Sequence, residues 1–344
     1  MASAPRLLVG AIVFGTTFSS WAFSFKHDYE RDHTKATVKM WNSGTLTTEK
    51  TPTCLLLKPD GTFDAFGYDA ESRYRELADN NDHMHYYFFR HFKMSLFKQL
   101  GRAGTKKEQL TIALEPVHGV QDQNTLREVV ASNVVGWGGI MVNKAFEDFL
   151  KELAGKDVFE QFKVHEIEDW LCMQREFEVK KREIRNSARR VLMHLPASTV
   201  ELCEKERKLC FIDVIASTRY AELVEIKRDN INISKIVLFY LFGDPTKKTV
   251  MYVKKILNYN ETKDIKAILM VGGFCESPLL QHAVKEAFPE EQVLIPSNVS
   301  STVLRGALIF GHNPECITVR TLKYTNGDKT TTPFKAWLHA VEKN

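Results

Sequence analysis

LLVGAIVFGTTFSSWAFSF, residues 7–25, decides the fold of this chain. An apolar run reaches Gly15-Thr16-Thr17, and residues 18–25 then alternate between two faces, as strands do. We therefore expect strands over 7–14 and 18–25, joined by this turn. A secretory signal peptide is the alternative, because Arg6 precedes the run. The run is short and this turn breaks it, which favours the strand over the signal peptide. A membrane span would need roughly 20 apolar residues, which the run does not reach.

The composition is typical of a soluble globular protein, with 44% hydrophobic and 26% charged residues in a chain of 344. This length predicts one bilobed unit or two domains. The net charge of +4, from 47 basic and 43 acidic residues, does not indicate nucleic-acid binding. The six cysteines form no CxxC pair, which favours reduced thiols in a cytoplasmic protein over a metal site. No segment reaches the length of a membrane span.

The rest of the chain predicts a mixture of strands and helices. Residues 53–69 are typical of a β-hairpin around Pro59-Asp60-Gly61. Strand, helix, strand and helix then alternate between 267 and 311, which favours layered α/β packing. The other expected elements are strands over 35–41 and 108–116 and in RRVLMHLP and KLCFIDVI, helices over 70–79, 82–100, 146–153 and 157–186, two helices flanking Gly243-Asp244-Pro245, and a tail past about 326.

The first turn has the chemistry of a phosphate loop. Backbone N–H groups at a tight glycine turn bind phosphate, and short hydroxyl side chains assist them. Gly15 lets the chain fold back, and the hydroxyls of Thr16 and Thr17 reach toward phosphate oxygens. An ordinary hairpin turn is the alternative interpretation.

Two further glycine turns lie later in the chain. LMVGGFCESPLLQ, residues 269–281, predicts a strand, a Gly-Gly turn and a helix that begins at Ser277-Pro278. Two adjacent glycines let a flat base or a ribose approach the backbone closely, although a plain strand-to-helix connection has the same pattern. Gly136-Trp137-Gly138-Gly139 is most simply a loop.

Six motifs occur together in one order, and together they resemble a known family. They are AIVFGTTFSSWAFSF, TCLLLKPDGTFDAFGYDA, YYFFRHFKMSLF, LTIALEP, GWGGIMVNKAF and AILMVGGFCESPLLQHAV. Over residues 8–325 the chain resembles the divergent type-12 branch of the 70-kDa heat-shock proteins (the heat shock 70 kDa protein 12 family), within the actin-like ATPase superfamily. The resemblance implies an α/β, two-lobed, ribonuclease H-like fold, with a five-stranded mixed sheet in each lobe and ATP between them.

The resemblance assigns roles on the phosphate side. It implies that Gly15, Thr16 and Thr17 hold the β- and γ-phosphates. Lys93 falls near the lysine that orients the transferred phosphate, with a surface helix charge as the alternative. Glu115 matches the acid that positions metal-bound water, with a strand-end carboxylate as the alternative.

The same resemblance assigns the adenosine side. It implies that Gly272, Gly273, Glu276 and Ser277 form the adenosine-side loop and that Lys180 and Lys181 flank the adenine. Gly138 and Gly139 are expected among the other cofactor-binding residues. It also divides the chain into a first lobe over 1–118, a second lobe over 119–325 and a tail over 326–344.

The sequence departs from the family pattern where metal and phosphate are held. Val13 stands where the family has an aspartate near hydrated Mg²⁺, and valine offers neither charge nor hydrogen-bond acceptor. The glycine-rich second phosphate loop expected after LEP has no counterpart, and Asn143 stands where an aspartate is usual. The fold is therefore expected to be incomplete in the first lobe and at the start of the second. Hydrolysis is expected to be slow or lost, since phosphoryl transfer depends on positioning and electrostatics.

Two functions follow as hypotheses. The first is an ATP- or ADP-binding, heat-shock-type protein of the cytoplasm, with a chaperone role in the stress response, protein clients or co-factors as partners, and ATP with Mg²⁺ by resemblance. The second is a non-enzymatic interaction or scaffold protein that no longer uses nucleotide. Neither implies nucleic acid or a membrane span.

Overall fold

The computed structural model describes residues 7–43, 47–93, 112–114, 117–122, 125–130, 133–135, 137–299 and 301–319. These residues form a mixed α/β structure. Within them, no helix combines the length and the apolar character that crossing a membrane requires.

The N-terminal hairpin is confirmed. Strands β1 (Leu8–Phe14) and β2 (Phe18–Phe25) pair antiparallel in unbroken register from Leu8↔Phe25 to Phe14↔Ser19. Strands β3 (Thr37–Val38) and β6 (Thr51–Pro52) also pair with β2, which completes a four-stranded sheet. Helix α1 (Lys26–Arg31) follows β2 directly. The expected strand over 35–41 is shorter than predicted, because β3 covers two of its residues and β4 (Trp41–Asn42) pairs instead with β5 (Thr47–Thr48).

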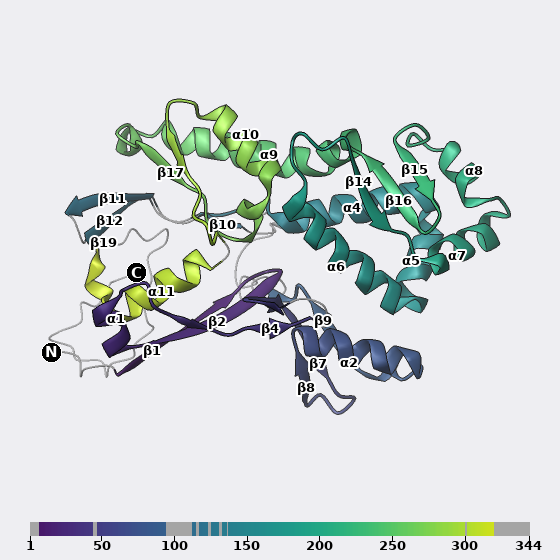
Figure 1. The fold of residues 1–344 in the computed structure, drawn as a ribbon, viewed down its shortest axis with the longest axis horizontal. Coiled ribbons are helices and arrows are strands. Elements are labelled where there is room, and N and C mark those ends of the chain that lie inside the picture. Colours follow the sequence, from purple (N-terminus) through teal and green to yellow (C-terminus); the bar gives the residue numbers. More distant parts are fainter. Residues whose placement is uncertain are drawn as a thin grey trace, which may run out of the picture.

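Helix α11 (Thr302–His312) packs on this sheet although it lies near the other end of the described chain (Figure 1). Leu304 and Leu308 are buried against Val9, Ala11 and Ala22. A Cβ placed on Gly311 would lie 2.3 Å from the Val9 side chain, so only glycine permits this close approach.

A second small sheet carries helix α2 (Tyr68–Asp79). Strand β7 (Cys54–Leu57) pairs antiparallel with β8 (Phe63–Phe66), as the hairpin pattern predicts, and also with β9 (Tyr87–Arg90). The predicted helix over 82–100 is wrong for 86–92, where the structure has strand β9 and the turn after it. The short helix η1 (His83–His85) precedes β9, and 94–100 lie outside the described residues. Consecutive aromatic residues favour a strand that has a partner to pair with, and β7 provides it.

The middle of the chain builds a helical body around a three-stranded sheet (Figure 1, upper right). Its elements are α4 (Gly139–Ala154), α5 (Lys156–His165), α6 (Ile167–Glu183), β14 (Arg190–His194), α7 (Ala197–Arg207), α8 (Phe211–Ala216), β15 (Val224–Lys227), β16 (Asn230–Ser234) and α9 (Lys235–Leu257). The expected helices over 146–153 and 157–186 and the strand in RRVLMHLP are confirmed.

Two expectations in this body are wrong. KLCFIDVI contains helix α8 rather than a strand, because Phe211, Val214 and Ile215 recur at helical spacing and are all buried. The residues around Gly243-Asp244-Pro245 do not separate two helices, since α9 runs through Pro245. Proline removes one intrahelical hydrogen bond, but the buried face of Val237, Leu238, Leu241 and Phe242 holds the helix in place.

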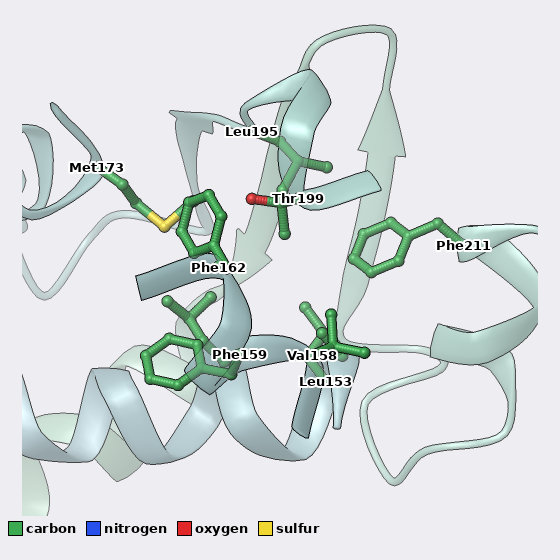
Figure 2. A pocket seen from close by; sticks show the side chains of 10 residues that line it. Leu153, Val158, Phe159, Phe162, Met173, Leu195, Thr199 and Phe211 are labelled. Carbon is green, nitrogen blue, oxygen red and sulfur yellow. The ribbon is translucent and has the colours of Figure 1, made fainter. Parts of the chain in front are cut away.

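The core of the helical body contains a small apolar cavity of about 10 Å³ (Figure 2). Leu153, Val158, Phe162 and Phe211 line it, together with Thr199. The Thr199 hydroxyl is buried and has no hydrogen-bond partner within the described residues. No residue that the sequence assigns to a binding site borders this cavity.

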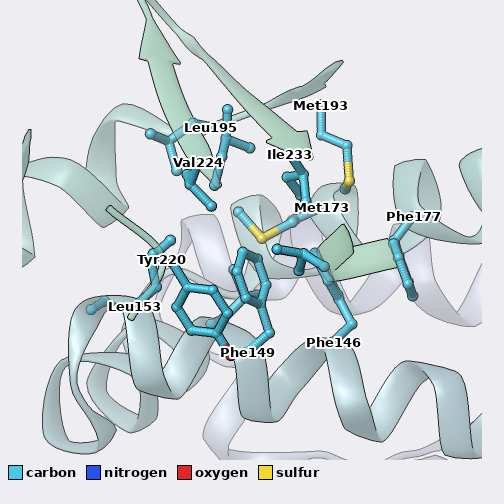
Figure 3. Close-up of a cluster of buried hydrophobic side chains, with 14 of the residues drawn as sticks. Phe146, Phe149, Leu153, Met173, Phe177, Met193, Leu195, Tyr220, Val224 and Ile233 are labelled. Atoms are coloured by element: carbon cyan, nitrogen blue, oxygen red, sulfur yellow. The ribbon is translucent and has the colours of Figure 1, made fainter. Parts of the chain in front are cut away.

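Stacked aromatic rings join the helices of this core (Figure 3). The rings of Phe146 on α4 and Phe177 on α6 lie 3.9 Å apart, centre to centre, and are nearly parallel. Phe149 meets Tyr220 edge to face at 4.9 Å. The Phe146–Phe177 contact fixes α6 against α4 and therefore sets where the last turn of α6 points.

The closing strand–helix–strand–helix order is confirmed. Strands β17 (Ala267–Leu269) and β18 (Gln292–Leu294) are parallel, and helix α10 (Pro278–Ala287) connects them. The short helices η3 (Asn260–Thr262) and η4 (Gly273–Glu276) lie before β17 and before α10.

The remaining strands form small sheets. Strand β10 (Ile112–Leu114) falls within the expected strand over 108–116 and pairs with β13 (Asn133–Val135), while β12 (Thr125–Val130) lies between β11 (Val117–Asp122) and β19 (Ile317–Val319). The short helix η5 (Pro314–Cys316) leads into β19. Among the described residues the largest sheet has four strands, not the five that the resemblance implies. The expected tail over 326–344 lies outside them.

Candidate functional site

The Gly15–Thr17 turn is held through its carbonyl oxygens. The Thr53 hydroxyl donates to Gly15 O at 2.8 Å, and the Thr53 N–H donates to Thr17 O at 2.8 Å. The His91 ring nitrogen Nδ1 lies 3.4 Å from Thr16 O. Since these bonds engage carbonyls, they leave the N–H groups of the turn to other partners, as an anion-binding turn requires.

Gly15 is required by close packing rather than by an unusual backbone angle. A Cβ at this position would lie 2.2 Å from Phe18 O. A backbone oxygen cannot move aside as a flexible side chain can, so any larger residue distorts the turn.

Lys93 lies at the base of the same turn. Its Nζ donates to Phe14 O at 2.5 Å and lies 5.8 Å from the centre of the Phe14 ring. Partial burial lowers the pKa of Lys93. The structure therefore brings together Lys93 and the turn that the sequence assigns to phosphate.

A buried lysine lies where α4 begins. Gly138 caps α4, and Lys181 Nζ approaches Gly139 O at 3.4 Å, Asn143 Oδ1 at 2.5 Å and Glu178 Oε1 at 2.7 Å. Burial lowers the pKa of Lys181, and Glu178 opposes that shift. Burial also opposes ionisation of Glu178, but the Lys181 ammonium, the hydrogen bonds from Lys181 and Asn143, and the Arg182 charge together outweigh it, so the pKa of Glu178 is lowered.

Lys180 is not brought into this group. It points away from Lys181 around α6 and pairs with Glu183 at 3.7 Å. Lys181 follows the buried Phe177 by four residues and so shares its inward face. Helical periodicity in the sequence would have been enough to place Lys180 and Lys181 on different faces of α6.

The Gly272–Gly273 turn presents an acidic side chain to two cations. Gly272 has a positive φ of 90°, a conformation that favours glycine. Glu276 Oε1 lies 3.6 Å from Lys50 Nζ, and Glu276 Oε2 lies 3.1 Å from Arg182 Nε. Ser277 is the N-cap residue of α10, and its buried hydroxyl has no hydrogen-bond partner within the described residues.

Arg182 and Lys50 connect these three groups. The Arg182 guanidinium lies 5.1 Å from the ring centre of Phe18, the residue that follows the phosphate-type turn, and it also contacts Glu276. Lys50 Nζ would lie 3.8 Å from a Cβ on Gly273, and Phe274 would lie 3.8 Å from a Cβ on Gly139. The first turn, the start of α4, the end of α6 and the Gly272–Gly273 turn therefore surround one region.

The structure places most of the predicted site residues around this region, but not all of them. Gly15, Thr16, Thr17 and Lys93 lie on one side of this region, and Gly138, Gly139, Lys181, Gly272, Gly273, Glu276 and Ser277 lie on the other. Lys180 lies apart. Glu115 lies outside the described residues.

Sequence reasoning missed Lys50, His91, Glu178 and Arg182. Glu178, Lys181 and Arg182 stand at helical spacing on one face of α6, and that signal was readable. Lys50 and His91 carry no local signal, because they reach the region only through the pairing of β6 and β9 in their sheets.

A buried carboxylate ties α6 to α2. Glu71 is only 1% exposed, and its oxygens lie 3.2 Å from Arg90 Nη2 and 2.6 Å from Arg175 Nη2. Arg175 also donates from Nε to Glu71 at 2.7 Å. Arg90 precedes His91, and Arg175 precedes Glu178 and Lys181 on α6, so this network positions both sides of the region.

Known proteins match almost the whole chain. Human Heat shock 70 kDa protein 12A is 22% identical over an alignment of 503 residues that covers 98% of this chain and 74% of that protein. Human Heat shock 70 kDa protein 12B is 23% identical over 507 residues, covering 98% and 73%. Mouse Heat shock 70 kDa protein 12A is 27% identical over 230 residues, covering 66% and 34%. No protein-family model matches the chain.

These matches support assignment to the heat shock 70 kDa protein 12 family. The human alignments of 503 and 507 residues are longer than this chain of 344. The heat shock 70 kDa protein 12 relatives therefore contain internal stretches with no counterpart here, in agreement with the motifs that the sequence lacks.

The family resemblance implies Mg²⁺ beside the phosphates, and the described side chains do not fit it. The Val13 side chain has no oxygen to offer, and the side chains hydrogen-bonded to the carbonyls of this turn and of Phe14 are those of Thr53, His91 and Lys93, none of which is a carboxylate. Within the described residues no group of three or more His, Cys, Asp or Glu side chains could hold a metal ion.

Proposed function

We propose that this chain binds an adenine nucleotide, ATP or ADP, between the Gly15–Thr17 turn and the Gly272–Gly273 turn, and that it hydrolyses ATP slowly or not at all. The observation that carries the proposal is the convergence of two glycine turns and the start of α4 on the cations Lys50, Lys181 and Arg182. Glycine turns let phosphate and base approach the backbone, and the cations supply the positive charge that an anionic nucleotide requires.

We expect weak hydrolysis because the sequence lacks the second phosphate loop and the aspartate near the metal. The resemblance gives Lys93 and Glu115 catalytic roles, but Lys93 is hydrogen-bonded to Phe14 O. Removing one oxyanion donor in other enzymes costs on the order of 3 kcal/mol. A missing phosphate loop and a missing aspartate should cost more, which corresponds to about a thousandfold or greater loss of rate.

The remaining parts of the proposal rest on the resemblance. They are a two-lobed actin-like fold with lobes over 1–118 and 119–325, a tail over 326–344, and a cytoplasmic chaperone role in the stress response with protein clients. Helix α11 falls within 119–325 in the sequence but packs on the N-terminal sheet, so we propose that in space it belongs with the first lobe.

Titration with a fluorescent ATP analogue tests the binding proposal. Gly273→Trp is expected to weaken binding about twentyfold, because the indole fills the region beside Lys50. A Cβ at Gly273 makes only ordinary contacts, so the fold should persist. Gly243→Trp is the matched control, since Gly243 lies on α9 with open space around it.

The outcomes separate the two functions. Absence of saturable binding, with Gly273→Trp indistinguishable from the unaltered protein, would favour the non-enzymatic scaffold. Mg²⁺-dependent hydrolysis that Glu115→Gln abolishes would contradict the loss of turnover.

A further inference from the structure

His91 lies against the phosphate-type turn in an unusual backbone conformation. Its φ of 52° falls in the left-handed region, which residues other than glycine rarely adopt and which is concentrated at functional sites. The His91 N–H donates to Thr53 O at 3.3 Å, and the ring nitrogen Nδ1 lies 3.4 Å from Thr16 O. Because Thr53 also donates to Gly15 O and Thr17 O, the segment that carries His91 is fixed to the turn.

The contact with Thr16 O decides which nitrogen of the ring can gain a proton. A carbonyl oxygen only accepts hydrogen bonds, so Nδ1 carries the hydrogen in this contact and the neutral ring has its lone pair on Nε2. A proton added to Nε2 charges the ring and leaves the contact with Thr16 O in place. The ring can therefore become positive without releasing the turn.

Charged groups from two elements act on this ring. Burial is the largest cause of the lowered pKa of His91, and Arg90, the preceding residue of β9, lowers it further. From α6, Glu178 raises this pKa and Lys181 lowers it. Lys93, two residues after His91, adds positive charge at the base of the turn. The neutral ring is therefore favoured in the absence of an anion, and a negative charge nearby favours the protonated ring.

On the basis of the proposed nucleotide function, we propose that His91 takes up one proton from solvent at Nε2 when the nucleotide phosphates bind to the Gly15–Thr17 turn. The imidazolium and Lys93 then supply counter-charge on the phosphate side of the region. This attraction needs no direct contact, since opposite charges interact over roughly 8 Å at physiological salt and further in partly buried sites. Val13 supports the assignment, because an apolar side chain in place of an acid leaves the counter-charge to cationic groups of the protein.

Calorimetric titration with ATP in two buffers of different ionisation enthalpy tests the proposal, because the difference in heat measures the protons taken up. At about pH 7 the unaltered protein should take up about half a proton more per ATP than His91→Gln does. Glutamine keeps a donor for Thr16 O but does not titrate. His85→Gln is the matched control and should behave as the unaltered protein does, since His85 is an exposed histidine of the preceding helix η1.

Proton uptake also makes ATP affinity depend on pH. Because phosphate raises the pKa of His91, the complex binds more protons than the free protein, and affinity rises as the pH falls. At about pH 6 the unaltered protein should bind ATP roughly fivefold more tightly than His91→Gln, whereas at about pH 8 the two affinities should agree within about twofold. Adenosine, which has no phosphate, should bind both proteins equally under both conditions.

His91→Asn protects the test against a folding failure of His91→Gln, because asparagine tolerates the left-handed conformation. It should show the same loss of proton uptake. Equal proton uptake by the unaltered protein and these variants would overturn the proposal. A loss of ATP affinity that is as large at alkaline as at acidic pH would also overturn it, because the ring would then only hold the turn in place.

Inorganic tripolyphosphate separates this inference from the nucleotide function. If the unaltered protein binds neither adenosine nor ATP, the nucleotide function fails. Greater proton uptake with tripolyphosphate by the unaltered protein than by His91→Gln would then still support the role of His91. Equal proton uptake by the two proteins, or no binding of tripolyphosphate, would overturn that role as well.

Discussion

Glu71→Ala is expected to lower the free energy of unfolding by about 3–5 kcal/mol. The carboxylate is buried between Arg90 and Arg175, and its removal leaves two guanidinium groups facing each other without an anion. Breaking a buried ion pair from one side costs far more than the intact pair contributes, because the remaining charge stays desolvated. Chemical denaturation with urea measures the loss.

Glu76→Ala on the same helix provides the control. Glu76 is exposed and pairs with Arg73 at 3.2 Å, so we expect a change within about 0.5 kcal/mol. A loss below about 1 kcal/mol for Glu71→Ala would show that the network does not fix α2 against α6. Nucleotide affinity should fall in parallel, because the same network positions His91 and the end of α6.

Gly15→Ala is expected to remove nucleotide binding and to destabilise the protein by about 1–3 kcal/mol. The added methyl group would lie 2.2 Å from Phe18 O, so the turn must open and its N–H groups lose their arrangement. We expect at least a hundredfold loss of affinity (about 2.7 kcal/mol) in the fluorescent ATP titration.

Gly10→Ala in the same hairpin is the control, because a Cβ there meets open space. Thr16→Val and Thr17→Val, which keep the backbone and remove one hydroxyl each, should weaken binding by smaller amounts. Undiminished ATP affinity in Gly15→Ala would show that this turn does not bind phosphate.

Local patterns predicted the parts of the fold that are set by local forces. The alternation in 18–25 predicted β2, and the turn at Pro59-Asp60-Gly61 predicted the β7–β8 hairpin. The errors arose where tertiary contacts prevail. The aromatic residues of β9 pair with β7, and α8 buries Phe211 in the helical body.

The same division applies to the site. Glycine turns are visible in the sequence because backbone geometry restricts their composition. Lys50 and Glu276 are 226 positions apart in the numbering, and no local pattern predicts that they meet. Lys181 was identified only as one of two neighbouring lysines, and the structure distinguishes it by its burial against Asn143 and Glu178.

Hydrogen exchange of the whole protein, with and without ATP, tests most directly whether the two glycine turns bind one nucleotide. We expect ATP to slow exchange in the segments around Gly15–Thr17 and Gly272–Glu276 together, while exposed hairpin residues such as Gly61 remain unchanged. Slowing in one of the two segments alone, or in neither at saturating ATP, would contradict a shared site.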